Sequence, residues 1–259
     1  GLKIIGITGS YGKTSVKNIL GTLLSEKYQV CVTPFSYNTP LGLSKTILEN
    51  VRGSCDVLVA EMGAKYVGDI KFLTQMINPD IGIITGIGNQ HLATFGSQEN
   101  LINTKAELFE YMKEGGKAYV NIDSVLARDL FKDIKREKVA TTIADNSGNC
   151  FVKNIKVTTS GSEFDLVLYG KEVQCETSLL GEHNISNILL CASVAFDMGV
   201  TIEQIAQGVS KLTPSVHRLA IIPSSNSLTV IDDAYNGSVQ GAKAALDVIS
   251  KFGGQKIVV

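Results

Sequence analysis

The chain has 259 residues, of which 44% are hydrophobic, and this is enough for one large domain with a smaller attachment. Its 24 Lys and Arg residues nearly balance 25 Asp and Glu residues, so the formal net charge is −1. This balance gives no general electrostatic reason to bind nucleic acid or an anionic membrane, and any anion recognition must be local.

Short, continuously apolar runs alternate with helical patterns over the first part of the chain. The runs at 3–8, 56–60 and 81–84 suit strands that are covered on both faces. Further elements follow the same alternation: helices at 13–26, 40–50, 68–77, 98–113 and 124–134, and strands at 117–121 and 138–143. This order predicts an α/β fold with a doubly wound, mainly parallel sheet.

The composition changes between about residues 150 and 180. Short alternating segments at 164–169 and 173–177, separated by glycine turns, predict a small antiparallel β insert. Two helices are then expected at 183–199 and 201–211.

A second α/β unit is predicted after the proline at position 214. Its expected elements are a strand at 227–232, a helix at 239–251 and a final strand at 255–259. We therefore divide the chain into a domain at 1–213 and the start of a second, Rossmann-like unit at 214–259. Because the last strand looks cut off as it enters a sheet, we expect the chain to be part of a longer protein.

The cysteines indicate the compartment. They are widely spaced, form no C-x-x-C pair and have mostly apolar neighbours: Cys31, Cys55, Cys150, Cys175 and Cys191. This pattern is typical of reduced core thiols and favours a cytoplasmic protein over a secreted one. No apolar run of 18 or more residues and no signal-peptide pattern occurs, so no membrane insertion is expected. The sequence gives no prediction of the oligomeric state.

The segment from Ile4 to Ser15 reads I-I-G-I-T-G-S-Y-G-K-T-S, in which an apolar strand passes through a glycine turn into a helix. Such a turn lets backbone N–H groups surround phosphate oxygens, while the lysine adds charge and the threonine hydroxyl can bind Mg²⁺. The form T-G-x-x-G-K-T is shorter than the strict Walker pattern, which needs glycine where the chain has Ile7. The expected nucleotide-binding residues are Gly9, Ser10, Gly12, Lys13, Thr14 and Ser15. The alternative is an ordinary glycine turn with a surface lysine.

Polar residues also follow the next two predicted strands. Glu61 begins the sequence E-M-G-A, and His91 follows T-G-I-G-N-Q. Ligands of an open parallel sheet bind beyond the carboxyl ends of its strands, so we expect the glycine turn, the carboxylate and the imidazole to face one crevice. A carboxylate is a natural Mg²⁺ ligand, and an imidazole is a less usual one. The alternatives are a capping or solvated carboxylate and a hydrogen-bonded loop histidine.

Three further sites contribute candidate nucleotide contacts. Asn184 and Asn187 lie on one face of the first turn of a predicted helix, where amides can read an adenine edge, although helix capping explains them equally well. Arg218 and Asp233 lie where the two predicted units meet, which favours an interdomain nucleotide contact over ordinary surface charges.

Five motifs resemble the Mur ligase family in order and spacing: T-G-S-Y-G-K-T, E-M-G-A, I-T-x-I-G-x-x-H-L-x-x-F-G-S, G-E-H-N-I-S-N and D-D-x-Y-N. The second, third and fifth are most similar to the branch of the family that adds D-alanyl-D-alanine to UDP-N-acetylmuramoyl-tripeptide. The resemblance covers nearly the whole chain, which corresponds to the central ATPase domain of the family and the opening of its C-terminal domain.

This resemblance implies an ATP- and Mg²⁺-dependent ligase of peptidoglycan synthesis. A substrate carboxylate would attack the γ-phosphate, and an amine would then displace phosphate from the acyl phosphate. The implied substrates are a UDP-muramoyl-peptide and a dipeptide or an amino acid, with no nucleic acid partner.

The resemblance also assigns roles to individual residues. The implied catalytic residues are Lys13, Lys105 and His91, and the implied metal ligands are Thr14, Glu61, His91 and Lys105. Lys105 matches a lysine that is carbamylated in several members of the family, whereas without the resemblance it would be an ordinary solvated residue. Asn184 and Asn187 match adenine contacts, Arg218 a phosphate contact and Asp233 a ribose contact.

The chain departs from the family pattern at several places. Tyr11 and Gly86 each stand where asparagine is usual, and the segments at 36–42 and 237–239 differ from the common forms. Two alternatives therefore remain beside the leading interpretation. One is another amide ligase of the superfamily, such as one similar to folylpolyglutamate synthase, and the other is a nucleotide-binding module without catalytic activity.

Overall fold

The structure is a computed structural model that describes residues 1–51, 53–88, 92–146, 148–215, 217–222, 224, 228–234 and 239–259. The first part of the chain forms β1 (Lys3–Thr8), α1 (Lys13–Leu24), β2 (Val30–Val32), α2 (Pro40–Asn50), β3 (Val57–Glu61), α3 (Asp69–Ile77), β4 (Ile81–Ile84), α4 (Leu92–Phe95), α5 (Gln98–Tyr111), β5 (Lys117–Asn121), α6 (Val125–Asp133) and β6 (Lys138–Thr141). The rest forms β7 (Cys150–Val157), β8 (Ser162–Leu168), β9 (Lys171–Thr177), α7 (Glu182–Asp197), α8 (Ile202–Ser210), β10 (Ala220–Ile222), β11 (Val230–Asp232) and α9 (Val239–Ser250).

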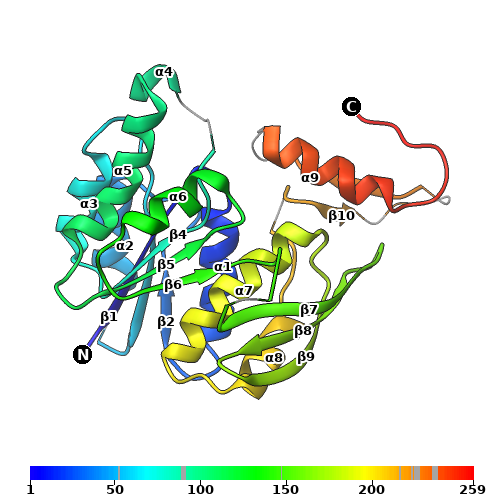
Figure 1. Ribbon diagram of the computed structural model, residues 1–259, viewed down its shortest axis with the longest axis horizontal. Coiled ribbons are helices and arrows are strands. Elements are labelled where there is room, and N and C mark those ends of the chain that lie inside the picture. Colours follow the sequence, from blue (N-terminus) through cyan, green and yellow to red (C-terminus); the bar gives the residue numbers. More distant parts are fainter. Residues whose placement is uncertain are drawn as a thin grey trace.

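A six-stranded parallel sheet has the order β2-β3-β1-β4-β5-β6 (Figure 1). The first strand in sequence, β1, lies between β3 and β4, with Gly6 beside Ala60 and Gly82. The ends of these three strands therefore come together at one edge, which is where ligands bind in open parallel sheets. This arrangement places the glycine turn after β1 next to Glu61 and next to the segment at 85–88.

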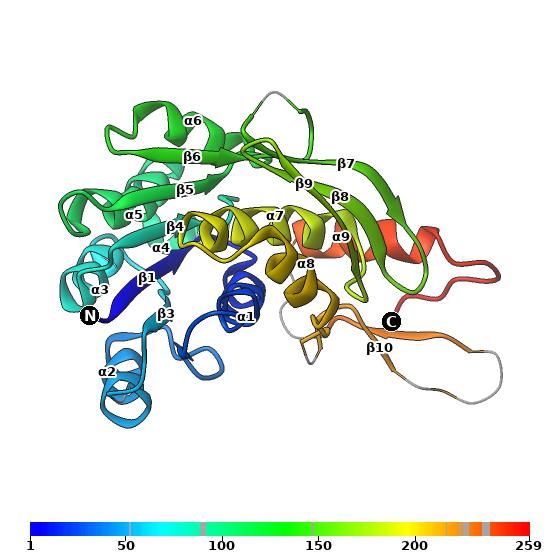
Figure 2. The ribbon, with the colours of Figure 1, turned by 90° about the horizontal axis from the view of Figure 1, so that it is seen from below.

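Helices cover both faces of this sheet (Figures 1 and 2). Ile5 and Ile7 of β1 pack in a core cluster with α1 and α7, whereas Leu58 and Ala60 of β3 pack in a second cluster with α3 and α5. Strands buried on both faces have continuously apolar sequences, which is why the runs in the sequence had no alternation. The predicted doubly wound α/β fold is confirmed.

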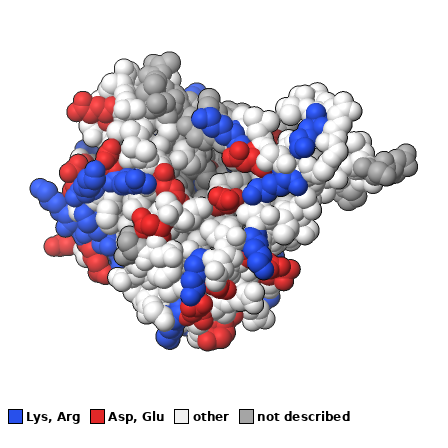
Figure 3. Space-filling view, turned by 45° about the vertical axis from the view of Figure 1, so that its right-hand side comes forward, with Lys and Arg blue, Asp and Glu red and all other residues white. Residues whose placement is uncertain are grey.

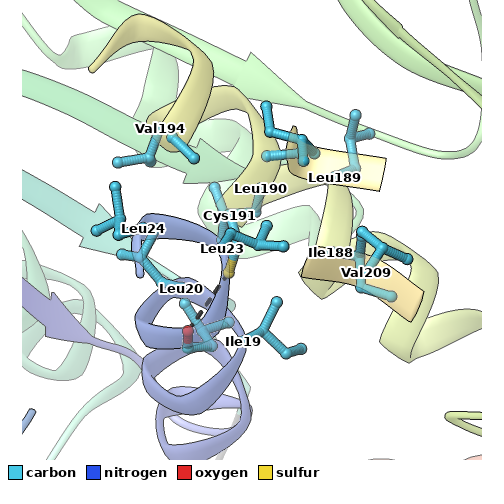
Figure 4. Close-up of a cluster of buried hydrophobic side chains, with 14 of the residues drawn as sticks. Ile19, Leu20, Leu23, Leu24, Ile188, Leu189, Leu190, Cys191, Val194 and Val209 are labelled. Atoms are coloured by element: carbon cyan, nitrogen blue, oxygen red, sulfur yellow. Dashed lines mark hydrogen bonds between the residues drawn. The ribbon is translucent and has the colours of Figure 1, made fainter. Parts of the chain in front are cut away.

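Apolar side chains join α1 to α7 (Figure 4). Leu20 and Leu23 face α7, and the Cys191 thiol donates a hydrogen bond to the carbonyl of Val16 at 3.4 Å. Full burial of one such leucine contributes about 1.5–3 kcal/mol. The helix that begins in the glycine turn and the helix that carries Asn184 are thus held in one packed layer.

The predicted antiparallel insert is also confirmed. It has three strands in the order β7-β8-β9, and it packs against α7 and α8. Most predicted helices and strands end within two residues of the observed ends, a difference of the size that fraying produces.

The segment after residue 213 contains the antiparallel pair β10–β11 and the helix α9. The strand predicted at 255–259 is wrong. Ile257, Val258 and Val259 are exposed, and among the described residues no strand pairs with them. An apolar run forms a strand only where a neighbour accepts its backbone hydrogen bonds.

Candidate nucleotide site

The turn between β1 and α1 has the backbone that its glycines predict. Gly9 has φ 153° and Gly12 has φ 78°, and a Cβ at Gly9 would lie 2.2 Å from the Thr85 hydroxyl. Gly12 caps α1 without a side-chain hydrogen bond, so the first N–H groups of the helix remain available to an anion. Both glycines are therefore required by the shape of a phosphate-binding turn.

The loop after β4 holds this turn in place. The Ser10 N–H donates to the Gly86 carbonyl at 2.8 Å, and the Ser10 hydroxyl donates to the Gly88 carbonyl at 3.1 Å. The Thr85 hydroxyl donates to the carbonyl of Tyr11. These bonds anchor the turn to the loop after β4.

Lys13 is the first residue of α1, and its Nζ donates to the Gly9 carbonyl at 2.9 Å. Burial lowers the pKa of Lys13, the Glu61 carboxylate raises it, and the nearby charge of Arg218 lowers it. A lysine that folds over its own loop in this way can turn to a phosphate without rearrangement of the backbone.

Glu61 is the centre of a buried polar network at the end of β3. Its Oε2 accepts a hydrogen bond from the Thr14 hydroxyl at 3.0 Å and lies 3.3 Å from the Lys17 ammonium. Its Oε1 accepts a hydrogen bond from the Asn38 amide at 3.0 Å. The side chains of Glu61 and Lys17 are each 2% exposed, so the ion pair is almost fully desolvated.

Two members of this network, Lys17 and Asn38, were not among the predicted site residues. Lys17 lies three residues after Thr14 on α1, so its position on the same helical face was a usable signal. Asn38 comes from the loop before α2, and its approach to Glu61 depends on the fold of that loop. No local pattern in the sequence indicates that contact.

Lys105 lies on α5 and is 3% exposed. Burial is the main cause that lowers its pKa to about 7; the charge of Lys13 adds to this, and the carboxylates of Asp69 and Glu107 oppose it. Its ammonium lies 6.0 Å from the centre of the Phe95 ring. The solvated surface position expected without the family resemblance is therefore wrong.

His91, predicted as a metal ligand, lies outside the described residues. Within the described residues, no three His, Cys, Asp or Glu side chains are grouped so that they could hold a metal ion. Thr14 and Glu61 nevertheless place two oxygen ligands side by side. Mg²⁺ commonly takes one or two protein oxygens and completes its shell with water and phosphate, so this pair fits that ion.

One cavity of about 1010 Å³ lies over the phosphate turn. Its lining includes most of the predicted nucleotide-binding residues: Ser10, Gly12, Lys13, Thr14, Ser15, Asn184, Asn187, Arg218 and Asp233. Gly9, Glu61 and Lys105 are not part of the lining, since Gly9 shapes the turn and the other two are buried. Residues from α1, α7 and the segment after 213 thus share one space of a size that suits a small-molecule ligand.

The two asparagines of α7 have different surroundings. The Asn184 amide donates to the Leu180 carbonyl at 2.9 Å, a local bond at the start of the helix. The Asn187 Oδ1 would lie 3.4 Å from a Cβ at Gly12, so Asn187 faces the phosphate turn. On the opposite wall, Asp233 accepts a hydrogen bond from the Leu219 N–H at 3.2 Å, and burial raises its pKa.

The surface around this site carries charges of both signs. Figure 3 shows Lys and Arg interspersed with Asp and Glu on the face that it presents. Charge in the cavity is therefore contributed locally, by residues such as Lys13 and Arg218.

None of the helices in the described part of the chain combines the length and the apolar character needed to cross a membrane.

Comparison with known proteins adds a second line of evidence. Among curated proteins, the UDP-N-acetylmuramoyl-tripeptide–D-alanyl-D-alanine ligase of Mycobacterium tuberculosis is 32% identical over 252 residues, covering 96% of this chain and 49% of the relative. MurF from Acinetobacter baumannii has a TM-score of 0.90 at 27% identity, with 98% of this chain and 55% of that chain covered.

A third relative was solved with a bound nucleotide. MurF ligase from Thermotoga maritima in complex with ADP has a TM-score of 0.88 at 26% identity, with 98% of this chain and 58% of that chain covered. The chain spans about half the length of the curated relatives that it matches. The model of the Mur ligase middle domain matches residues 7–195, which include the phosphate turn, Glu61, Lys105 and both asparagines of α7. The chain belongs to the Mur ligase family.

Proposed function

We propose that this chain is the ATP-binding part of a ligase that joins D-alanyl-D-alanine to UDP-N-acetylmuramoyl-tripeptide in peptidoglycan synthesis. The names of the relatives support the reaction. The observation that carries the proposal is the cavity, whose lining brings Lys13 and Thr14 together with Asn187 and Arg218, while the buried Glu61 accepts a hydrogen bond from Thr14 behind it. Phosphate, metal and base contacts are thereby within reach of one nucleotide.

In the proposed complex the turn at 9–15 surrounds the phosphates with its N–H groups, and the Lys13 ammonium leaves the Gly9 carbonyl to neutralise the β- and γ-phosphates. Asn184 and Asn187 contact adenine, Asp233 contacts the ribose and Arg218 contacts a phosphate. The ADP complex of the Thermotoga relative supports nucleotide binding.

Thr14 and Glu61 would hold a magnesium ion, with His91 and Lys105 as further proposed ligands. The ion would neutralise charge on the triphosphate. For Lys105 we propose carbamylation: the neutral amine nitrogen bonds to the carbon of CO₂ and loses a proton, which creates a carboxylate-like group. Its pKa of about 7 supports this role, because an appreciable fraction of the amine is unprotonated near neutral pH.

The reaction that we propose needs no protein nucleophile. The substrate carboxylate attacks the γ-phosphorus and ADP leaves, and then the amine of the second substrate attacks the acyl carbon and phosphate leaves. The residues of the chain position the groups and stabilise negative charge, which is the main source of catalysis in phosphoryl transfer. Lys13, His91 and Lys105 are the proposed catalytic residues.

We also propose the division into a nucleotide-binding domain at 1–213 and a second unit that starts at 214, and we place the protein in the cytoplasm, where ATP is available. Arg218 and Asp233 then reach the nucleotide from the second unit. The oligomeric state is no part of the proposal.

Two experiments test the function. Calorimetric titration of the chain with ADP and Mg²⁺ should show binding, and Lys13→Ala should weaken it about 100-fold. With the protein that contains this chain, ATP consumption should require both UDP-N-acetylmuramoyl-tripeptide and D-alanyl-D-alanine. ATP consumption without either substrate would contradict the ligase, and nucleotide binding without any turnover would favour a non-catalytic module.

Because the chain departs from the family pattern at Tyr11 and Gly86, we also test the alternative that the protein is an amide ligase with other substrates. If other amino-acid or dipeptide amines replace D-alanyl-D-alanine with higher kcat/KM, the protein is another amide ligase of the superfamily. The nucleotide site would be the same in that case, and only the substrates would change.

A further inference from the structure

Gly86 lies just beyond the end of β4, and the phosphate turn is bonded directly to it. A Cβ at Gly86 would lie 2.7 Å from two ring carbons of Tyr11 and 2.8 Å from its hydroxyl oxygen, and side chains do not approach that closely. Gly86 does not have a positive φ, so its backbone is open to any residue. The Tyr11 ring therefore occupies the space that a side chain at position 86 would need.

Tyr11 also connects three segments at the edge of the sheet. Its carbonyl accepts a hydrogen bond from the Thr85 hydroxyl, and its side chain lies close enough to Ser124, at the start of α6, for Ser124 to lower the pKa of the Tyr11 hydroxyl, which burial raises. Ser124 in turn donates to the Ile87 carbonyl at 2.6 Å. The phosphate turn, the loop after β4 and the turn after β5 thus meet at Tyr11, through its backbone carbonyl and its ring.

Tyr11 and Ser124 both line the cavity, so this junction forms part of its wall. The ring is half-buried, and Gly12 and Lys13 follow directly in the chain. A ring forced out of its place against Gly86 would therefore disturb the segment that carries the N–H groups of the proposed phosphate site.

We propose that Tyr11 is a positioning residue of the nucleotide site, and that Gly86 is the partner that its ring requires. The inference rests on the proposed nucleotide site. The close contact couples the two positions, because the ring at position 11 fills the space that a side chain at position 86 would need. A side chain at 86 would expel the ring and release the turn.

A double-mutant cycle tests the coupling. The variants are Gly86→Ala, Tyr11→Ala and the double variant, and the measurements are calorimetric affinity for ADP with Mg²⁺ and the Tm without nucleotide. Gly86→Ala should weaken binding at least about tenfold, since overpacking of a fitted contact has a cost of that size. Once Tyr11 is Ala, the same change at 86 should cost less than about twofold.

Two controls keep the result specific. Gly53→Ala adds a methyl group where nothing lies within 4 Å, so affinity and Tm should stay at the wild-type values. Tyr11→Phe keeps the ring that contacts Gly86 and should bind within about threefold of the wild type, since it loses only the hydroxyl group.

Equal losses from Gly86→Ala in both backgrounds would overturn the proposal. If Gly86→Ala does not fold, folding of the double variant supports the proposal, and failure of the double variant beside a folded Tyr11→Ala overturns it. If the wild type binds no ADP, the proposed function fails, while the Tm cycle still decides whether the two residues are coupled.

Discussion

The two walls of the cavity are packed differently. The wall that contains Lys13 and Thr14 is backed by the six-stranded sheet, which has a large core cluster on each face and the buried side chains of Glu61 and Lys105 behind the cavity lining. Arg218 and Asp233 belong to a segment whose cluster, within the described residues, has Leu180, Leu219 and Val248 as its buried members. Local opening costs least where few apolar groups are buried. The sheet wall is therefore preformed, and the opposite wall can adjust to a ligand.

This comparison predicts the largest effect at the buried ion pair. Glu61→Ala leaves the Lys17 ammonium at 2% exposure without its carboxylate, and removal of one partner of a buried pair costs about 3–5 kcal/mol. The free energy of unfolding in urea measures this. Glu137→Ala is the control, since its carboxylate is 70% exposed and its pair with Lys117 contributes about 0–1 kcal/mol.

A rescue variant sharpens this prediction. The double variant Lys17→Met with Glu61→Leu removes both charges of the pair, so most of the stability that Glu61→Ala loses should return. Equal stability losses in Glu61→Ala and Glu137→Ala would show that the pair is not desolvated, and the sheet wall would then be less rigid than we infer.

The next effect concerns pH and Lys105. The folded state lowers the pKa of Lys105 to about 7, so above this pH the unfolded chain binds more protons than the folded chain. Stability should therefore rise from about pH 7 to about pH 10, and the penalty of burying the charge is fully present below pH 7. The change is about 2–4 kcal/mol.

Urea unfolding of the metal-free chain at several pH values, compared with Lys105→Met, isolates this contribution. As pH falls from about 10 to 7, the free energy of unfolding of the wild type should fall relative to that of Lys105→Met. Parallel curves for the two proteins would show that Lys105 is solvated.

Lys13→Ala should affect ligand binding more than folding. Loss of the ammonium that faces the phosphates should weaken ADP binding about 100-fold, whereas the Tm without nucleotide should change little, since Lys13 is only half-buried and donates to one carbonyl. Calorimetry and thermal unfolding measure the two quantities. A large fall in Tm would indicate a structural role instead.

Arg218→Ala should have the smallest effect, a loss of about tenfold in ADP affinity without a change in Tm. Lys243→Ala, an exposed cation on α9 of the same segment, is the matched control and should bind normally. If Arg218→Ala lowers the Tm as much as Glu61→Ala does, the two walls of the cavity are equally rigid and the comparison is wrong.

Much of the sheet wall could be predicted from the sequence, because its determinants are local. Gly9 and Gly12 adopt the positive φ that the turn pattern implies, and the continuously apolar runs became strands covered on both faces. The end of each strand then fixed the positions of the phosphate turn and Glu61. Local chemistry and the rules of parallel sheets were sufficient here.

Contacts between distant segments could not be predicted in the same way. Asn38 meets Glu61, and Tyr11 meets Gly86, only because separate loops fold to one edge of the sheet. At residues 255–259 the local pattern predicts a strand that does not form, because strand formation depends on a partner that the pattern does not contain. Each case depends on tertiary neighbours that a local pattern does not contain.

The central position of β1 has a consequence for synthesis on the ribosome. β1 emerges before the two strands with which it pairs, β3 and β4, so the edge that carries the phosphate turn is incomplete until residue 84 has left the exit tunnel. The wall formed by α7 arrives only after residue 187. On a nascent chain the glycine turn is therefore exposed before its surroundings are complete, and a ligand of the proposed site could stabilise only the later folding steps.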